Sequence, residues 1–359
     1  MLKMTDSMSE LENRAGVALE ALLRQVPAIR LKGIRYEPQN VDHGIDIWVD
    51  IMVGNRPHVL ACEVKSNGQP RHVRTALLQL RNYAAHLEGA TTPILIAPYL
   101  SPEAQALCRE QGGGFLDLEG NARIVFDGVF IERSVAHKPV IDRRGLRSLF
   151  KPKSTQILRV MLREPTRAWR VTELAVAAEA SLGHVSNVRT ALLDREWAMI
   201  SSDGMSLTEP DALLDAWRDA YEPPVGERSR FYTTLHGRTL EEAAHTALGV
   251  GPEARAAYGS FSAAHWLAPY GRISTQFFYA DGAGLEKLRH ALKLSGTAKG
   301  ENVVVVVPKD DGLFRDVIEP APRVICTDYV QTYLDLTAAG ERGQEAAEHL
   351  RSERLTWPK

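Results

Sequence analysis

The sequence predicts a mixed α/β protein, of the α+β kind, with three domains in 359 residues. Strand-like apolar runs and helical spacing alternate over the first 132 residues, and three helix-like segments with a hairpin follow. A second α/β alternation occupies the C-terminal third. Hydrophobic residues make up 44% of the chain and charged residues 25%, which is typical of domains with ordinary buried cores.

The composition also limits which cell compartment and which kinds of partner are expected. The net charge of −2 indicates that any basic surface must be local. Cys62, Cys108 and Cys326 lie far apart without metal-site spacing, which argues against a zinc site or a disulfide framework. The polar, acidic N-terminus does not resemble a signal peptide, and the longest apolar run, Val303–Pro308, is too short to span a bilayer. We therefore expect a cytoplasmic protein that does not enter membranes.

The first domain is expected over residues 1–132. Helical spacing runs from Leu11 to Val26, and a loop is expected after Pro27. A hairpin follows, with its turn at residues 54–57. The predicted elements after the first helix are strands Ile45–Val53 and His58–Lys65, helix Val73–Leu87, strand Pro93–Pro98, helix Ser101–Gln111, and strands Phe115–Leu118 and Ala122–Phe126.

Residues 133–153 form a basic linker that includes Arg143 and Arg144. It is either a solvated connector or a segment that contacts phosphate. Residues 154–222 then show the order helix, helix, helix, hairpin, which predicts a winged helix-turn-helix domain. Its elements are expected at Thr155–Arg163, Thr172–Ala178, Ser181–Arg195, Met199–Ser201 and Met205–Leu207, with a two-residue turn at Asp203-Gly204.

The helix from Ser181 is the candidate recognition helix. Val185, Val188 and Leu192 give it an apolar face, and the remaining polar side chains are available to read base edges in the major groove. Arg167 and Arg170, just before the second helix, are suited to phosphate contacts. The alternative is a winged helix used for protein–protein packing. The predicted base-reading residues are Ser181, His184, Asn187 and Arg189.

A possible catalytic site lies on the first hairpin. Glu63 and Lys65 share one face of a strand because alternate side chains point the same way. The partner strand would bring Asp46 beside Glu63. Two carboxylates form an oxygen site suited to Mg²⁺, with Mn²⁺ as a substitute, and a neighbouring lysine can assist an attacking water or the developing charge.

Residues 10–130 resemble the PD-(D/E)xK nuclease superfamily, which includes restriction endonucleases and archaeal Holliday junction resolvases. The resemblance rests on Gly44-Ile45-Asp46 and Glu63-Val64-Lys65 within the expected element order. It implies a restriction-endonuclease-like fold with Asp46 and Glu63 as metal ligands and Lys65 as the catalytic lysine. It also implies that Gln79 and Tyr83 position the phosphate and that a first-helix glutamate, Glu20 or Glu12, holds a second metal.

Residues 223–359 are expected to form an α/β domain, with helices at 239–248, 263–268, 329–338 and 344–354 and strands at 274–279 and 303–307. Residues 154–355 resemble AbiEi-type antitoxins, whose members repress their own toxin–antitoxin operon. This resemblance rests on four segments: Ser262–Leu267, Asn302–Pro308, Gln331–Leu336 and Gly340–Ala347. The simplest antitoxins lack the nuclease-like domain that the other resemblance implies for residues 10–130.

The sequence is compatible with three functions. The first is a DNA-binding transcriptional regulator of the antitoxin type, carried by a plasmid or mobile element and paired with a toxin. The second is an active Mg²⁺-dependent endonuclease, acting on branched DNA, that the winged helix targets. The third is a protein-interaction module. A homodimer is expected because symmetric proteins match the two-fold pseudo-symmetry of duplex DNA.

Overall fold

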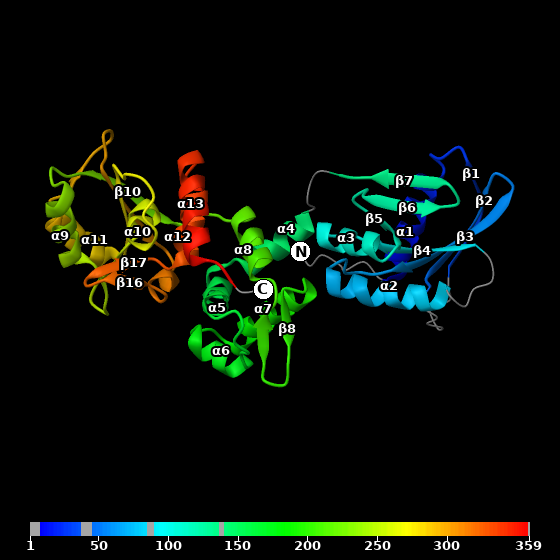
Figure 1. Ribbon diagram of the computed structural model, residues 1–359, viewed down its shortest axis with the longest axis horizontal. Helices are drawn as coiled ribbons and strands as arrows, with labels where there is room; N and C mark the ends of the chain where they lie inside the picture. The colour runs from blue at the N-terminus through cyan, green and yellow to red at the C-terminus, as the bar shows by residue number, and fades with distance from the viewer. Residues whose placement is uncertain (1–7, 37–44, 85–89, 136–139, 358–359) are drawn as a thin grey trace. The chain divides into compact units, whose positions relative to one another are not determined.

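The structure is a computed structural model that describes residues 8–36, 45–84, 90–135 and 140–357. The chain divides into two compact units (Figure 1). The first contains residues 1–145 and 190–196, and the second contains residues 146–189 and 197–359. Both combine helices with a large sheet, as the predicted α/β class requires. None of the described helices combines the length and apolarity needed to cross a membrane.

The first unit is built on a seven-stranded sheet whose spatial order follows the chain. The central strands β3, β4 and β5 are parallel, and the outer strands on both sides are antiparallel. Helices α2 and α3 make the two crossovers that parallel neighbours require. The elements are α1 (Met8–Leu23), β1 (Ile29–Tyr36), β2 (Ile47–Val53), β3 (Arg56–Val64), α2 (Pro70–Ala84), β4 (Thr91–Ala97), α3 (Pro102–Glu110), β5 (Gly114–Asp117), β6 (Ala122–Phe126) and β7 (Val129–Arg133).

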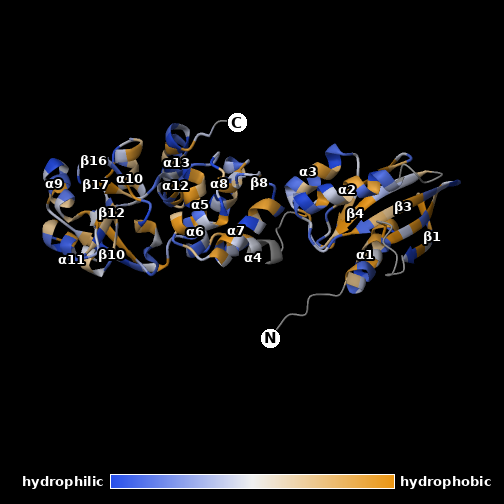
Figure 2. Ribbon diagram, turned by 90° about the horizontal axis from the view of Figure 1, so that it is seen from below, coloured by the Kyte–Doolittle hydropathy of each residue, from blue (hydrophilic) through white to orange (hydrophobic). Residues whose placement is uncertain are grey.

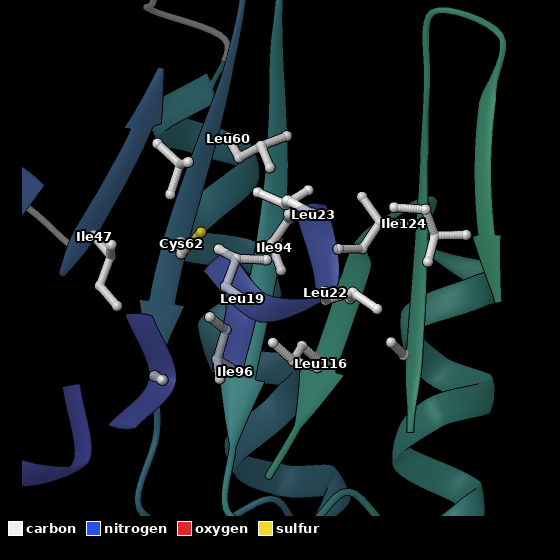
Figure 3. Packing of buried hydrophobic residues seen from close by; sticks show 14 of the residues in the cluster. Leu19, Leu22, Leu23, Ile47, Leu60, Cys62, Ile94, Ile96, Leu116 and Ile124 are labelled. Atoms are coloured by element: carbon white, nitrogen blue, oxygen red, sulfur yellow. The ribbon is translucent and has the colours of Figure 1, made fainter. Parts of the chain in front are cut away.

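Two apolar layers hold this sheet. Leu19, Leu22 and Leu23 of α1 pack on one face, against residues such as Ile94 and Ile96 (Figure 3). Side chains of α2 and α3 pack on the other face, because successive strand residues point to opposite sides. The central strands are therefore rich in apolar residues, which appear orange in Figure 2. Burying each large side chain contributes about 1.5–3 kcal/mol.

The sequence did not predict strands β1 and β7. In β1, Arg30 and Lys32 alternate with apolar residues, and only Ile29 is buried. Both strands lie at edges of the sheet, where one backbone side has no ladder and charged side chains are common. The segment expected as a loop after Pro27 is thus partly a strand. The segment predicted as a basic linker contains a helix, α4 (Val140–Leu149).

The second unit begins with a helical segment and a hairpin. Helices α5 (Pro152–Arg163), α6 (Val171–Ala177) and α7 (Leu182–Asp194) are followed by strands β8 (Ala198–Ile200) and β9 (Met205–Leu207), where the sequence predicts them. Residues 190–196 of this stretch count with the first unit. The hairpin turn is centred one residue earlier than predicted: Ser201 N donates to Gly204 O, which leaves Ser202 and Asp203 at the tip.

The remainder of the second unit is built on an eight-stranded sheet with helices around it. The six strands and helices predicted there are all present. Several elements were not predicted, among them the central strand β12 and helix α11. The elements are α8 (Pro210–Asp219), β10 (Gly226–Tyr232), α9 (Gly237–Ala247), β11 (Gly249–Val250), β12 (Arg255–Tyr258), α10 (Ser260–Leu267), β13 (Gln276–Ala280), α11 (Gly282–Ala291), β14 (Ser295–Gly296), β15 (Val303–Pro308), β16 (Ile318–Ala321), β17 (Val324–Cys326), α12 (Tyr329–Thr337) and α13 (Glu341–Arg354).

Candidate functional site

The first candidate site lies at one end of two neighbouring strands of the seven-stranded sheet, where β2 begins and β3 ends. The antiparallel register pairs Ile47 with Cys62, which places Asp46 opposite Glu63. Ile45 packs with the apolar layer under α2 and α3, whereas Ile47 packs with the layer under α1, so strand alternation is broken beside Asp46. The Lys65 ammonium forms an ion pair with Oε1 of Glu63. The structure therefore brings Glu63 and Lys65 together and places Asp46 at the neighbouring strand end, beside the Val64 amide.

The backbone holds Asp46 in this position. Its amide N donates to the carbonyl of Cys62 at 2.9 Å, and its Oδ2 accepts from the amide of Val64 at 2.6 Å. Glu63 is buried, with 3% of its surface exposed, whereas Lys65 is partly exposed. A buried carboxylate is costly unless a cation or a donor neutralises it. Lys65 provides that charge here.

The sequence left Glu12 and Glu20 open as the first-helix carboxylate. Burial, and then the negative charge of Asp46, raise the pKa of Glu12 above its ordinary value, so these two carboxylates lie within electrostatic reach. Glu20 instead forms an ion pair with Arg24 at 2.6 Å. Eight residues of helix separate the two glutamates by about 12 Å. The geometry thus favours Glu12 as the neighbour of Asp46.

Gln79 and Tyr83 do not join this cluster. They occupy the third and fourth turns of α2. This helix starts at Pro70, near the end of β3 that precedes Lys65, and runs back toward the opposite ends of the strands, where β4 begins. Gln79 therefore lies about 14 Å along the helix from its first residue. Gln79 is exposed, and Tyr83 packs on the apolar layer under α2. A phosphate-positioning role beside Glu63 does not follow from these placements.

One polar residue at the same sheet edge was missed. Asp117, at the end of β5, is buried and accepts hydrogen bonds from the amides of Leu100, Glu119 and Asn121 and from the Asn121 side chain. These hydrogen bonds join the loops after β4 and β5. They occupy both carboxylate oxygens of Asp117, so we do not assign it to a metal site. Among the described residues, no three His, Cys, Asp or Glu side chains form a metal-binding group. Two carboxylates with water ligands still fit Mg²⁺, which commonly keeps several waters.

The second candidate site is the exposed face of α7. Val185, Val188 and Leu192 are buried as predicted, with at most 1% of their surface exposed. Ser181, His184 and Asn187 are exposed, and Arg189 is half-buried. Ser181 caps the helix because its Oγ accepts from the His184 amide at 3.3 Å, and it also lies 2.7 Å from Nδ1 of His184.

The predicted phosphate-contacting arginines have different surroundings. Arg167 lies over the Trp169 ring at 3.7 Å and pairs with Glu164 at 3.1 Å, while its side chain stays about half exposed. Arg170 is exposed at the start of α6. Arg143 and Arg144 fall within α4, but their side chains lie outside the described residues.

Sequence reasoning also missed a buried polar network around α12. Asp335 accepts hydrogen bonds from the hydroxyls of Tyr221 at 2.5 Å and Tyr279 at 3.0 Å, and from Gln331 Nε2 at 2.9 Å. Gln331 also accepts from the buried Arg159 guanidinium, which lies 3.3 Å from Asp328. The i, i+4 spacing of Gln331 and Asp335 was the available signal. Tyr333, Leu334 and Leu336 are core, as expected.

Burial raises the pKa of Asp335 to about 6, although its hydrogen bonds from Tyr221, Tyr279 and Gln331 favour the charged form. Arg159 belongs to α5 and Tyr221 follows α8, whereas the other members belong to the sheet-containing part of the unit. The network therefore joins the helical segment to the C-terminal segment of the second unit.

Comparison with known proteins locates one family. Residues 206–356 match the family described as transcriptional regulator, AbiEi antitoxin, of type IV toxin–antitoxin systems. No curated protein matches the chain. A solved structure titled "Structure of EndoMS in apo form" is 16% identical and covers 29% of this chain and 45% of its own, with a TM-score of 0.22. The chain thus spans less than half of that protein, and at this TM-score the likeness carries no argument.

Proposed function

We propose that the protein is a DNA-binding transcriptional regulator of the antitoxin type, which controls a toxin–antitoxin operon on a plasmid or mobile element. The family match over residues 206–356 supports the regulatory class. The observation that supports DNA binding is that α7 has one buried face and one exposed polar face. Val185 and Val188 are buried, while Ser181, His184 and Asn187 face solvent on its first turns. We assign α5 to β9 to a winged helix-turn-helix domain.

In this proposal, α7 enters the major groove and its exposed polar side chains contact base edges. Arg170 and Arg167 contact phosphates and fix the register without reading sequence. The hairpin tip at Ser202 and Asp203 forms the wing. The partners are operator DNA, bound by a homodimer, and the toxin encoded with the regulator.

The test is fluorescence anisotropy of the full chain on duplex DNA from upstream of its own gene. Each lost base contact costs about 1–3 kcal/mol. We therefore expect the double variant His184→Ala/Asn187→Ala to weaken specific binding by about 10-fold or more without lowering the melting temperature. His290→Ala, an exposed histidine on α11, serves as the matched control. Unchanged affinity in the double variant would contradict the assignment of α7.

A second candidate function is metal-dependent cleavage of DNA in the first unit. Its support is the Glu63–Lys65 ion pair at the end of β3, with Asp46 at the adjoining start of β2 and Glu12 in electrostatic reach of Asp46. Asp46 and Glu63 would hold Mg²⁺ or Mn²⁺, which supplies Lewis-acid activation of a phosphodiester when bound. Lys65 would keep a positive charge beside Glu63, where a phosphate approaches.

This candidate is tested by incubating supercoiled and branched DNA with the full chain and Mg²⁺ or Mn²⁺. Cutting should disappear in Asp46→Ala and Glu63→Gln, and should persist in the matched variant Asp50→Asn, which removes a β2 carboxylate paired with Arg35. Glu12→Gln should reduce cutting more than Glu20→Gln. DNA that stays intact with the unaltered protein would leave the regulator as the whole function.

A further inference from the structure

The second unit contains a cavity of about 380 Å³ between its helical segment and its C-terminal segment. Its lining includes Phe150, Thr155 and Arg159, then Trp217 and Tyr221 from the segment around α8, and Leu313 and Gln331 from the C-terminal segment. This volume falls within the range of sites for small molecules. Its lining combines apolar walls with a few polar groups, as such sites usually do.

The charged groups of the cavity leave a positive excess. Arg159 is neutralised by Asp328 at 3.3 Å, and Arg147 by Glu222 at 3.4 Å. Asp310, the other lining carboxylate, accepts from the Gly312 amide at 2.9 Å. Lys151 and Lys309 also line the cavity and are exposed. Within the described part of the chain, neither ammonium has a carboxylate at ion-pair distance, so these two cations outnumber Asp310, whose negative charge the neutral amide does not cancel.

The apolar walls are planar. The rings of Phe150 and Trp217 stack with centroids 5.5 Å apart and an interplanar angle of 5°. Trp217 is buried and Phe150 is half-buried, so part of the Phe150 ring remains available to a ligand. Tyr221 and two prolines, Pro223 and Pro224, continue this surface. Flat apolar surface of this kind favours an aromatic ring, which gains from stacking as well as from area burial.

We propose that this cavity binds a small aromatic anion, with the ring against Phe150 and Tyr221 and the anionic group between Lys151 and Lys309. The shared chemistry is a planar ring with one phosphate or carboxylate. Because the cavity includes Thr155 and Arg159 of α5 and Gln331 of α12, a bound ligand touches both segments of the unit. This inference does not depend on DNA binding or on cleavage by the first unit.

The test is titration calorimetry of the full chain with two kinds of probe. Guanosine and uridine monophosphates carry a phosphate, and benzoate and indole-3-acetate carry a carboxylate, so the kind that binds identifies the anionic group. Guanosine, inorganic phosphate and acetate each lack one half of the proposed ligand. We expect at least one aromatic anion to bind with a Kd below roughly 1 mM, and each half-ligand to bind at least about ten-fold more weakly.

Lys151→Ala/Lys309→Ala is the diagnostic variant because both side chains are exposed and their loss leaves the core intact. Removing two surface charges should weaken binding by about ten-fold. Lys287→Ala/Lys299→Ala, which removes two exposed lysines elsewhere in the same unit, should bind as the unaltered chain does. The proposal is overturned if no aromatic anion binds, if a half-ligand binds equally well, or if the diagnostic and matched variants behave alike.

Discussion

Gly204 fixes the hairpin to the rest of the helical segment. Its φ is +150°, and a Cβ built there would lie 2.6 Å from backbone atoms of Trp169. This close approach accompanies two backbone hydrogen bonds between Trp169 and Met205, of 2.8 and 3.0 Å. The glycine is therefore needed for packing against Trp169, beyond any need of the turn itself.

We expect Gly204→Ala to lower the free energy of unfolding by about 3–4 kcal/mol, since backbone strain and a backbone clash add. Gly237 provides a matched comparison because its φ is +54° and no atom lies near its Cβ position. Gly237→Ala should cost only about 1–2 kcal/mol. Urea denaturation of both variants measures the difference, and equal losses would mean that the Trp169 contact is not limiting.

Asp335 should make the stability of the second unit depend on pH. Its pKa is raised from 3.8 to about 6 in the folded chain, so the folded form retains a proton that the unfolded form has lost between these values. The stabilisation is complete below about pH 4 and is lost as the pH rises through about 6. The gap corresponds to about 3 kcal/mol.

Asp335→Asn removes this titration, so the unfolding free energy of the variant, relative to the unaltered chain, should rise between pH 4 and pH 7. Urea denaturation followed by tryptophan fluorescence at both pH values gives that difference. Asp219→Asn, at an exposed carboxylate of α8, should show no such trend. A variant that tracks the unaltered chain at both pH values would show that Asp335 titrates normally.

Local patterns account for the residues that were predicted correctly. Glu63 and Lys65 follow from strand alternation, and Val185 and Val188 follow from helical spacing, both of which are set within a few residues. The burial of Asp335 within a hydrogen-bond network could not be predicted, because its partners Tyr221 and Tyr279 come from distant parts of the chain. The choice of Glu12 over Glu20 likewise depends on where α1 crosses the sheet, which no local spacing fixes.

Among whole elements, those with strong periodicity were predicted well, and short or highly charged strands were not. Helices α5, α7 and α12 have full apolar faces, so their bounds follow from sequence. β1 and β10 carry several charged residues and bury few side chains, so their strand character is set by the ladder they join. Helix α4 was not predicted because its segment was assigned to a linker from its charge alone.

Arg351 joins helix α13 to α8. Arg351 donates to Asp215 at 2.6 Å and to Asp211 at 2.8 Å, and its guanidinium lies 5.8 Å from the Tyr333 ring centroid. We expect Arg351→Met to lower the free energy of unfolding by about 1–2 kcal/mol, less at high salt because the carboxylates are partly exposed.

A double-mutant cycle with Asp215→Asn isolates the ionic part of this contact. Its coupling energy should be about 0.5–1 kcal/mol, the size usual for half-exposed pairs. A coupling energy of zero would show that Arg351 stabilises the helix pair through its contact with Tyr333 rather than through charge.

The division of the chain into two compact units predicts two unfolding transitions, because each unit has its own large sheet and core. Leu60 and Leu334, both fully buried, report on the first and the second unit respectively. Truncating either leucine to alanine should cost about 3 kcal/mol and lower the melting temperature of its own unit by roughly 5–10 °C. Differential scanning calorimetry of full-length Leu60→Ala and Leu334→Ala should therefore move different transitions, and the surface change Lys299→Ala should move neither. If both leucine variants shift one common transition, the units unfold cooperatively, and a ligand or DNA bound by one unit would then stabilise the whole chain.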